Sequence, residues 1–399
     1  MPPALSGIKV LDLTGMGPAS FAAMMLGDMG AEVIKISTPP GASERGVGQG
    51  IDFVEGEEPA FNMESLRNKR SMALNLKRDE GKRIFHQLAK NADVIIESYR
   101  PGVMDRLGIG YQSISDMNPG IIYCSVSGYG QESPYRNLPG HDCNYAAMGG
   151  TLSLIGYSDQ EPPVLVQNTL ADLTTAVLQA VIGILMAVIA RQKTGRGQIV
   201  DISMADGVVF LLNTIPEVAE YLFKGVVPRR GETIFGGAQP SYAVYETADG
   251  KYLTIGALEP HFWRNLCRAV EREDLLNDWF APSPRREEVF NELRGIFRSR
   301  SRDEWFEILS GADVPVGKVL EIDELFSEPH VLQREMLIEL EHPRFGKMKQ
   351  IGFPIKFSDT PWQVTSPASR LGEHTSEILS EMGYSQEEIE GLRSTRAIY

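Results

Sequence analysis

Two side chains that exchange protons stand at distinctive places in this sequence. His141 follows a glycine and precedes an aspartate, and imidazole is the side chain whose ordinary pKa lies nearest neutral pH. Asp172 opens a long apolar stretch, where the positive end of a helix stabilises a carboxylate or a nearby oxyanion. If both groups reached one carbon, they would form a pair that removes a proton from it and returns one.

Each candidate also has a structural interpretation. A lone histidine in a loop more often serves structure than chemistry, although the glycine before His141 permits close approach of a ligand to the backbone. Asp172 and Glu259 both stand where the N-cap residue of a helix is expected. Taken singly, none of the three residues identifies a function.

The elements that would position these residues alternate between strand and helix. The first apolar run is followed by Pro18, which suits the first position of a helix. Strands are predicted at 9–13, 32–36, 93–98, 121–127 and 198–203. This order predicts an α/β fold class with a doubly wound, Rossmann-like large domain. Dinucleotide binding is disfavoured, because Ser20 replaces the third glycine of that fingerprint and Thr38 stands where a ribose-binding acid is wanted.

The sequence after Gly225 has the composition of a linker, and a hairpin signal at 248–250 (Ala-Asp-Gly) follows. We therefore predict a large domain over 1–225, a small α+β domain over 230–335 and a C-terminal segment over 336–399 that returns to the large domain. Capping boxes at Ser301 and Ser385 predict helix starts in the last two parts.

Two long helices are predicted in the second half of the large domain. Residues 173–191 are apolar on nearly every face, which predicts a fully buried helix. A second helix is predicted over 205–224, with a kink at Pro216.

Basic side chains gather at two places. The first group surrounds a short alternating strand, for which a solvated surface is the ordinary interpretation. It consists of Arg67, Lys69, Arg70, Lys77 and Arg78. Arg100 and Arg106 stand just beyond the strand at 93–98. Ligands bind at the carboxyl ends of parallel strands, so guanidinium groups there can hold phosphates.

Bulk properties exclude several classes of protein. The 399 residues carry a net charge of -14, which argues against a general nucleic-acid partner. Three widely spaced cysteines fit neither a disulfide framework nor a metal site and indicate a reduced, cytoplasmic compartment. No signal peptide is expected. The apolar stretch 176–190 is shorter than the roughly 20 residues of a membrane span, so no membrane partner is expected.

Three motifs resemble the α-methylacyl-CoA racemases, which belong to the family III CoA-transferase (CaiB/BaiF) superfamily. They are 140–145 (Gly-His-Asp-Cys-Asn-Tyr), 170–172 (Leu-Ala-Asp) and 247–260, which ends in Leu-Glu-Pro. The similarity extends from Leu5 to about Tyr384. The resemblance implies a small domain inserted between the halves of the large one, and a homodimer whose two chains interlock like linked rings. Each active site would lie between one chain's large domain and the partner's small domain.

The resemblance also assigns roles to residues. It implies that His141 and Asp172 are the two acid/base groups and that Glu259 orients the histidine from the other subunit. The substrate would be an acyl-CoA thioester, with neither a metal nor a separate cofactor required. The residues expected to hold CoA are Leu74, Asn75, Leu76, Lys77, Ser98, Tyr99, Arg100, Arg106, Gly140, Asp142, Asn144 and Tyr145.

The implied reaction is inversion at the carbon next to the thioester of a 2-methylacyl-CoA. One group removes the α-proton from one face, and the other returns a proton to the opposite face of the enolate. Backbone N–H groups at the start of the Asp172 helix are the expected donors to the enolate oxygen.

A CoA-transferase is the main alternative. Leu173, Thr174 and Thr175 replace the glycine-rich run of the racemases and would crowd the acyl site, while Gln239 lies in a loop that resembles that of transferases. In such an enzyme Asp172 would attack an acyl-CoA, form a mixed anhydride and then carry CoA as a thioester. A CoA-binding protein without chemistry is the third possibility.

Overall fold

The computed structural model describes residues 1–15, 17–39, 64–167 and 169–399. It divides into two compact units, which are described separately. The first unit comprises Met1–Gly149, Val166–Val208 and Pro329–Tyr399, and the second comprises Gly150–Leu165 and Val209–Glu328. This division differs from the boundary predicted after residue 225.

One side chain explains why Gly150–Leu165 groups with the second unit. The guanidinium of Arg230 donates to the backbone carbonyls of Ser153, Ser158 and Glu161 at 2.8, 2.8 and 2.5 Å. The predicted boundary rests on local composition, which does not register a contact between segments so far apart in the sequence.

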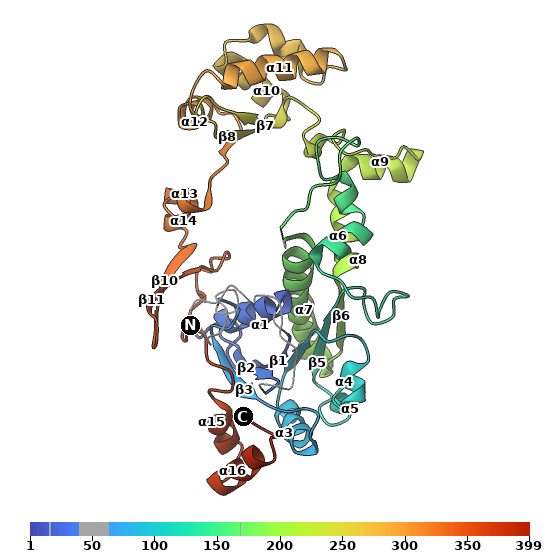
Figure 1. Cartoon of the computed structure of the whole chain (residues 1–399), viewed down its shortest axis with the longest axis vertical. Helices are drawn as coiled ribbons and strands as arrows, with labels where there is room; N and C mark the ends of the chain where they lie inside the picture. Colours follow the sequence, from blue (N-terminus) through green and yellow to red (C-terminus); the bar gives the residue numbers. More distant parts are fainter. Residues whose placement is uncertain (16, 40–63, 168) are drawn as a thin grey trace. The chain divides into compact units, whose positions relative to one another are not determined.

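A six-stranded sheet forms the centre of the first unit, with the order β3-β2-β1-β4-β5-β6 and parallel pairing throughout (Figure 1). Its strands are β1 (Lys9–Leu13), β2 (Glu32–Ser37), β3 (Lys69–Ala73), β4 (Val94–Glu97), β5 (Ile122–Ser127) and β6 (Ile199–Ser203). The α/β class and the parallel sheet are thus confirmed. The order places β1 and β4, where the winding direction reverses, side by side, which is the place where such sheets bind ligands.

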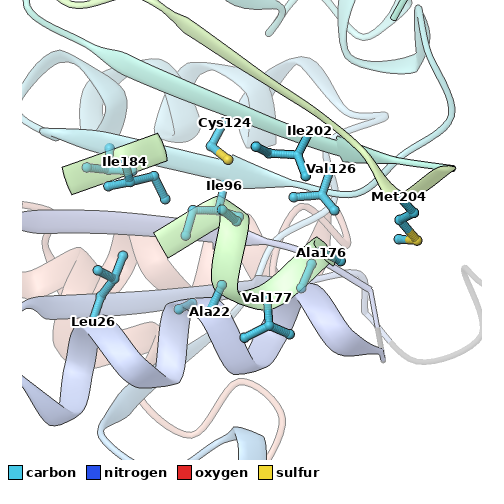
Figure 2. Packing of buried hydrophobic residues seen from close by; sticks show 14 of the residues in the cluster. Ala22, Leu26, Ile96, Cys124, Val126, Ala176, Val177, Ile184, Ile202 and Met204 are labelled. Carbon is cyan, nitrogen blue, oxygen red and sulfur yellow. The ribbon is translucent and has the colours of Figure 1, made fainter. Parts of the chain in front are cut away.

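Alternate residues along the strands enter two separate cores. On one face, Val10, Ile96 and Cys124 pack against α1 (Pro18–Asp28), α7 (Leu178–Thr194) and α8 (Met204–Leu211), as Figure 2 shows for part of the cluster. Leu11 and Ile95 face the other way and pack against further helices. These are α3 (Asp79–Lys90), α4 (Val103–Arg106), α5 (Tyr111–Ser115), α15 (Thr375–Glu381) and α16 (Gln386–Ser394). Helices therefore cover both faces of the sheet, as in a doubly wound fold.

Three residues of the first basic group, Arg67, Lys69 and Arg70, form ion pairs within the protein. Arg67 and Lys69 are each 2% exposed and bond the carboxylates of Asp28 and Asp12 at 2.6 and 2.8 Å. Arg70 is paired with two glutamates of α15. The interpretation of these three residues as a solvated surface is wrong. They hold the sheet to α1 and to the C-terminal helices, and they are not available to a ligand.

Helix α7 is only half buried, which corrects the prediction of a fully buried helix. Together with the preceding π-helical turn η2 (Thr169–Val177) it forms a 26-residue helix that is long and apolar enough to cross a membrane by length and composition alone. Its inner face packs on α1, β5 and β6. On the outer face, Ile182, Met186 and Ile189 are 50%, 65% and 54% exposed.

The helix predicted over 205–224 is interrupted. Helix α8 ends at Leu211, the short 3₁₀ helix η3 (Leu212–Thr214) follows, and Pro216 begins α9 (Pro216–Lys224). Proline therefore starts a new helix here instead of bending a continuous one, because its ring suits the first helical position.

The C-terminal part of the chain covers the outer edge of β3. It begins with α14 (Pro329–Gln333) and the hairpin of β10 (Leu337–His342) and β11 (Gly346–Ile351). Further on, His374 Nδ1 accepts the N–H of Ser71 at 3.1 Å and Thr375 Oγ1 accepts the N–H of Ala73 at 3.1 Å. Ile398 then forms an antiparallel bridge with Leu74. The outer edge of the sheet is thus paired with the end of the chain.

The second unit is an α+β fold with an antiparallel sheet. The predicted hairpin is present as β7 (Tyr242–Glu246) and β8 (Tyr252–Gly256), and β9 (Val316–Lys318) adds a third strand that was not predicted. Besides η3 and α9, the second unit contains η1 (Thr151–Leu154), η4 (Ile234–Gly236), α10 (Pro260–Ala269), η5 (Glu273–Asp278), α11 (Arg285–Phe297), α12 (Arg302–Gly311) and α13 (Ile322–Leu325). Both predicted capping boxes, at Ser301 and at Ser385 in the first unit, are confirmed.

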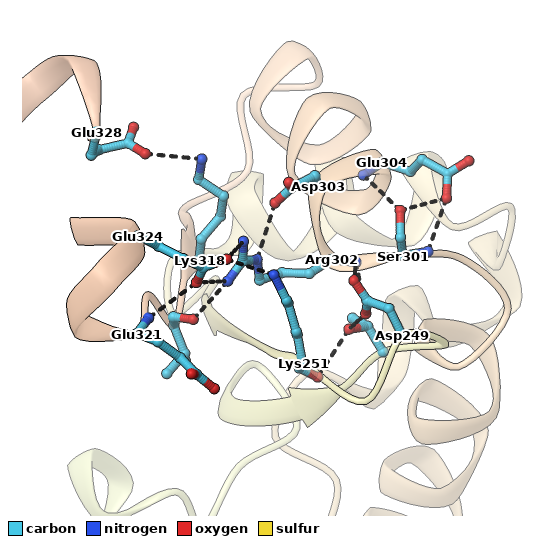
Figure 3. Close-up of polar contacts among 12 residues, drawn as sticks. Asp249, Lys251, Ser301, Arg302, Asp303, Glu304, Lys318, Glu321, Glu324 and Glu328 are labelled. Carbon is cyan, nitrogen blue, oxygen red and sulfur yellow. Dashed lines mark hydrogen bonds and ion pairs between the residues drawn. The ribbon is translucent and has the colours of Figure 1, made fainter. Parts of the chain in front are cut away.

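A buried arginine ties the parts of the second unit together (Figure 3). Arg302 donates to both carboxylate oxygens of Glu324 at 2.8 and 3.0 Å, and Lys251 bonds the same carboxylate at 2.5 Å. These contacts join α12, α13 and the residue that precedes β8.

Candidate functional site

One buried carboxylate brings the two proton carriers together. Asp142 is the first residue of helix α6 (Asp142–Met148) and is 3% exposed. Its Oδ1 accepts the backbone N–H groups of Ala171 and Asp172 at 2.8 and 2.9 Å. Because His141 immediately precedes Asp142, this contact places the imidazole-bearing residue beside the start of the Asp172 helix. The first expectation about the site, that His141 and Asp172 share one region, agrees with this geometry.

Local contacts explain the residues around His141. The histidine is the N-cap residue of α6, and Asn144 Oδ1 accepts its backbone N–H at 2.9 Å. Tyr145 donates its hydroxyl to the carbonyl of Gly140 at 2.7 Å. A Cβ on Gly140 would lie 2.7 Å from the Tyr145 ring, so the glycine is required by this tyrosine. The side chain of His141 itself is exposed.

The carboxyl group of Asp172 has the acidity of a proton carrier. Burial raises the pKa of Asp172 to about 6, the nearby carboxylate of Asp142 acts in the same direction, and the charge of His141 opposes it. A carboxyl group with a pKa near 6 is able to donate and accept a proton close to neutral pH.

Two expectations about the Asp172 helix are wrong. Asp172 is not the N-cap residue, because it lies inside η2 (Thr169–Val177), a π-helical turn of the kind often found at functional sites. The N–H groups of Ala171 and Asp172 already donate to Asp142, so they do not serve as free donors to an enolate oxygen. That interaction was not predictable, since Asp142 is distant in the sequence.

The residues after Asp172 crowd the site less than expected. Thr175 is fully buried, and its hydroxyl donates to the carbonyl of Met204 at 3.1 Å. A Cβ on Gly207 would lie 2.3 Å from that of Thr175, so this threonine faces the core. Leu173, which is 47% exposed, is the bulky side chain that remains outside.

The turn after β4 is anchored to three neighbouring strand ends. Ser98 Oγ accepts the N–H of Gly15, which follows β1, at 3.0 Å. Glu97 Oε2 accepts the N–H of Tyr99 at 2.8 Å, and the Ser125 hydroxyl of β5 donates to the same carboxylate. The side chain of Thr38, after β2, is in hydrogen-bonding contact with the Tyr99 hydroxyl. This turn presents Arg100 to the solvent.

Glu97 was not among the predicted site residues. It is 4% exposed, and burial raises its pKa to about 7. Its only signal in the sequence is an acidic residue at the end of an apolar strand.

The Arg100 turn and the Asp172 region lie at the same end of the sheet. Burial and the neighbouring Tyr129 and Asp172 raise the pKa of Tyr145 to about 12, and the positive charge of Arg100 opposes this rise. Tyr145 therefore lies within electrostatic reach of both Arg100 and Asp172. Of the expected CoA residues, Gly140, Asp142, Asn144 and Tyr145 lie together around His141, and Arg100 is near enough for its charge to act on Tyr145.

Other predicted residues lie elsewhere or are engaged. Leu74 and Leu76 are buried in the core, and Asn75 donates its backbone N–H to Ala397 at 2.8 Å. In the 74–77 segment only Lys77 is exposed. Glu259 is the N-cap residue of α10 in the second unit, and its role at the site stays a prediction.

No metal site is evident in the parts of the chain that the structure describes, since no three His, Cys, Asp or Glu side chains are grouped to hold an ion. The cysteines Cys124, Cys143 and Cys267 are free thiols.

Comparisons with known proteins identify the family of the chain. The model of CoA-transferase family III matches residues 5–375. The chain is 34% identical to the α-methylacyl-CoA racemase of Mus musculus, over 99% of this chain and 97% of the relative. It is also 34% identical to the succinyl-CoA:glutarate CoA-transferase of Homo sapiens, over 95% of this chain and 86% of the relative.

A solved structure agrees with the fold. The crystal structure of a CaiB/BaiF family protein from Brucella suis superposes with a TM-score of 0.82 at 29% identity, covering 96% of this chain and all of that one. With a parallel six-stranded sheet and a family match over almost its whole length, this chain belongs to CoA-transferase family III.

Proposed function

We propose that this protein interconverts the (R) and (S) forms of 2-methylacyl-CoA thioesters by moving the α-proton. The observation that carries the proposal is the Asp142 contact, which joins the His141 segment to Asp172. The raised pKa of Asp172, about 6, supports an acid/base role for that carboxyl group.

In this reaction His141 removes the α-proton of one enantiomer, and Asp172, protonated, returns a proton to the opposite face of the enolate. The roles reverse for the other enantiomer. Asp142 fixes the distance between the two segments and, through its negative charge, keeps part of Asp172 protonated near neutral pH.

We further propose a homodimer with shared active sites, in which Glu259 of the partner subunit orients His141. The exposed apolar face of α7 supports association, because Ile182, Met186 and Ile189 would otherwise remain in water. CoA enters only as part of the substrate, and no separate cofactor is proposed.

CoA transfer between carboxylic acids is the second candidate. It is favoured by the half-buried Asp172 carboxyl group, which is ionised above about pH 6 and is then able to attack a thioester. A transferase relative is as similar to this chain as a racemase relative. In this alternative His141 takes no part in bond making.

One experiment separates these functions from simple CoA binding. The protein is incubated with a single enantiomer of a 2-methylacyl-CoA in deuterated water, with and without a free carboxylic acid. Deuterium entry at the α-carbon with loss of optical purity indicates racemisation. CoA on the added acid, absent in Asp172→Ala, indicates transfer. If neither change occurs, the protein only binds CoA.

The variant His141→Ala tests the assignment of the base. We expect α-proton exchange to fall by about 10²- to 10⁴-fold, whereas His330→Ala, at an exposed histidine of α14, leaves it unchanged. Near-normal exchange in His141→Ala would remove the two-base mechanism.

A further inference from the structure

Two arginines from different segments meet beside Gly102, in the turn that follows β4. A Cβ placed on Gly102 would lie 3.3 Å from an Nη atom of Arg106 and 3.8 Å from an Nη atom of Arg136. Both arginines are exposed. Within the described ranges neither guanidinium has a carboxylate partner or another hydrogen-bond acceptor.

The position of Arg106 is fixed by its own turn. Gly102 has a φ of 78°, which favours glycine, and its carbonyl accepts the backbone N–H of Arg106 at 3.1 Å. The same turn is anchored to the sheet through Glu97 and Ser98. Arg106 therefore projects from a segment with little freedom to move.

The position of Arg136 is fixed from the other side, by the segment that leads to His141. The backbone N–H of Arg136 donates to Ser133 at 3.0 Å. The ring of the next-door Tyr135 packs on Tyr129 at 5.7 Å between centroids, and Tyr129 packs on Tyr145 at 5.3 Å. A row of tyrosines thus connects Arg136 to helix α6.

The two unpartnered arginines lie in a chain with an excess of acidic residues. It has 53 acidic and only 39 basic residues, and the basic residues of the 67–70 segment are all ion-paired. Like charges repel, and a shared anion removes that repulsion.

We infer that Arg106 and Arg136 form a paired-guanidinium site for a phosphate group, and that Arg136 is a substrate-binding residue. Guanidinium groups match phosphate oxygens with paired hydrogen bonds. The inference rests on the proposed function, under which the phosphate belongs to the nucleotide portion of CoA. The turn follows the carboxyl end of β4, and the charge of Arg100 on the same turn reaches Tyr145, so the site is at the end of the sheet where the thioester would react.

The test measures CoA affinity by titration calorimetry, together with KM and kcat for a 2-methylacyl-CoA. In Arg136→Gln we expect about tenfold weaker CoA binding and a matching rise in KM, with kcat unchanged, because a hydrogen bond to a charged group is lost. The matched control is Arg196→Gln, which makes the same charge change at an exposed arginine before β6, at the opposite edge of the sheet.

Truncated ligands identify the phosphate. The corresponding pantetheine thioester, which has no nucleotide, is expected to react equally well with the wild type and with Arg136→Gln. If the difference between the two proteins disappears with dephospho-CoA, the site holds the 3′-phosphate; if it persists, the site holds the diphosphate. Unchanged CoA affinity in Arg136→Gln, or an equal loss with the pantetheine thioester, overturns the inference.

The two proposals fail in different ways. Weaker CoA binding in Arg136→Gln, in a protein that neither racemises nor transfers, would leave the phosphate site standing and remove the proposed reaction. Normal turnover with unchanged CoA affinity in Arg136→Gln would leave the proposed reaction standing and remove the phosphate site.

Discussion

Asp142 has two effects on Asp172 that the sequence does not reveal. Its Oδ1 accepts two backbone N–H groups at the start of η2, and its negative charge raises the pKa of the Asp172 carboxyl group. Position and acidity of the proposed acid/base residue therefore depend on the residue next to His141.

The pH dependence of the reaction should follow Asp172. For the enantiomer whose α-proton is taken by His141, Asp172 must be protonated, so kcat/KM should fall as the pH rises through about 6. For the opposite enantiomer, kcat/KM should rise through the same region. In Asp142→Asn, which keeps an oxygen acceptor but loses the charge, both inflections should move to lower pH. Inflections that stay in place would contradict the electrostatic role of Asp142.

The same group should limit stability. The pKa of Asp172 is raised from 3.8 to about 6 in the folded protein, so its contribution to stability is lost as the pH rises through that window. Replacing Asp172 by Asn removes this loss. We expect Asp172→Asn to raise Tm relative to the wild type more at pH 8 than at pH 5, as measured by scanning calorimetry. An equal difference in Tm at pH 8 and at pH 5 would contradict this prediction.

At the scale of elements, a buried ion pair joins α1 to the segment before β3. Asp28, the last residue of α1, bonds Arg67 at 2.6 Å and the Asn68 amide at 2.7 Å, and Arg67 also donates to the carbonyl of Ile351 at 2.7 Å. Helix α1 is thereby fixed to the sheet and to the end of β11.

Removing that carboxylate should destabilise the first unit strongly. Asp28→Ala leaves a buried guanidinium without its partner, which costs about 3–5 kcal/mol of unfolding free energy. Asp79→Ala removes an exposed ion pair to Lys82 and should change that free energy by less than about 1 kcal/mol. Urea unfolding of both variants checks the comparison, and similar values for the two would contradict the role of Asp28.

The strands were predictable because apolar runs are local. The runs at 9–13 and 121–127 match β1 and β5 within one residue. The ion-pair partners of the basic residues were not predictable, because they are distant in the sequence. Lys69 pairs with a carboxylate on β1, and Arg67 pairs with one at the end of α1. The link between Asp142 and η2 escaped prediction for the same reason. These three contacts are set by the fold, and a local pattern does not contain them.

At the scale of the whole molecule, the open face of α7 is the main unpaired feature of the first unit. The apolar pattern at 173–191 indicates burial but does not say whether the covering surface belongs to the same chain. Ile182, Met186 and Ile189 remain accessible in the single chain, and a second copy is the proposed cover.

A charge on this face should break the dimer. We expect Met186→Glu to sediment as a monomer at a concentration where the wild type sediments as a dimer, because a carboxylate would be buried without a partner. Gln192→Glu adds the same charge at an exposed position near the end of the helix and should leave the dimer intact. A dimeric Met186→Glu would place the interface elsewhere.

The pairing of β3 with the last residues has a practical consequence for anyone who handles the protein. An uncovered border strand is a template for attachment of other chains, and here His374, Thr375 and Ile398 block it. A purification tag fused after Tyr399, or protease cleavage upstream of Ala397, would weaken the pairing of β3 with the end of the chain and promote aggregation. A tag at the amino terminus leaves this pairing intact.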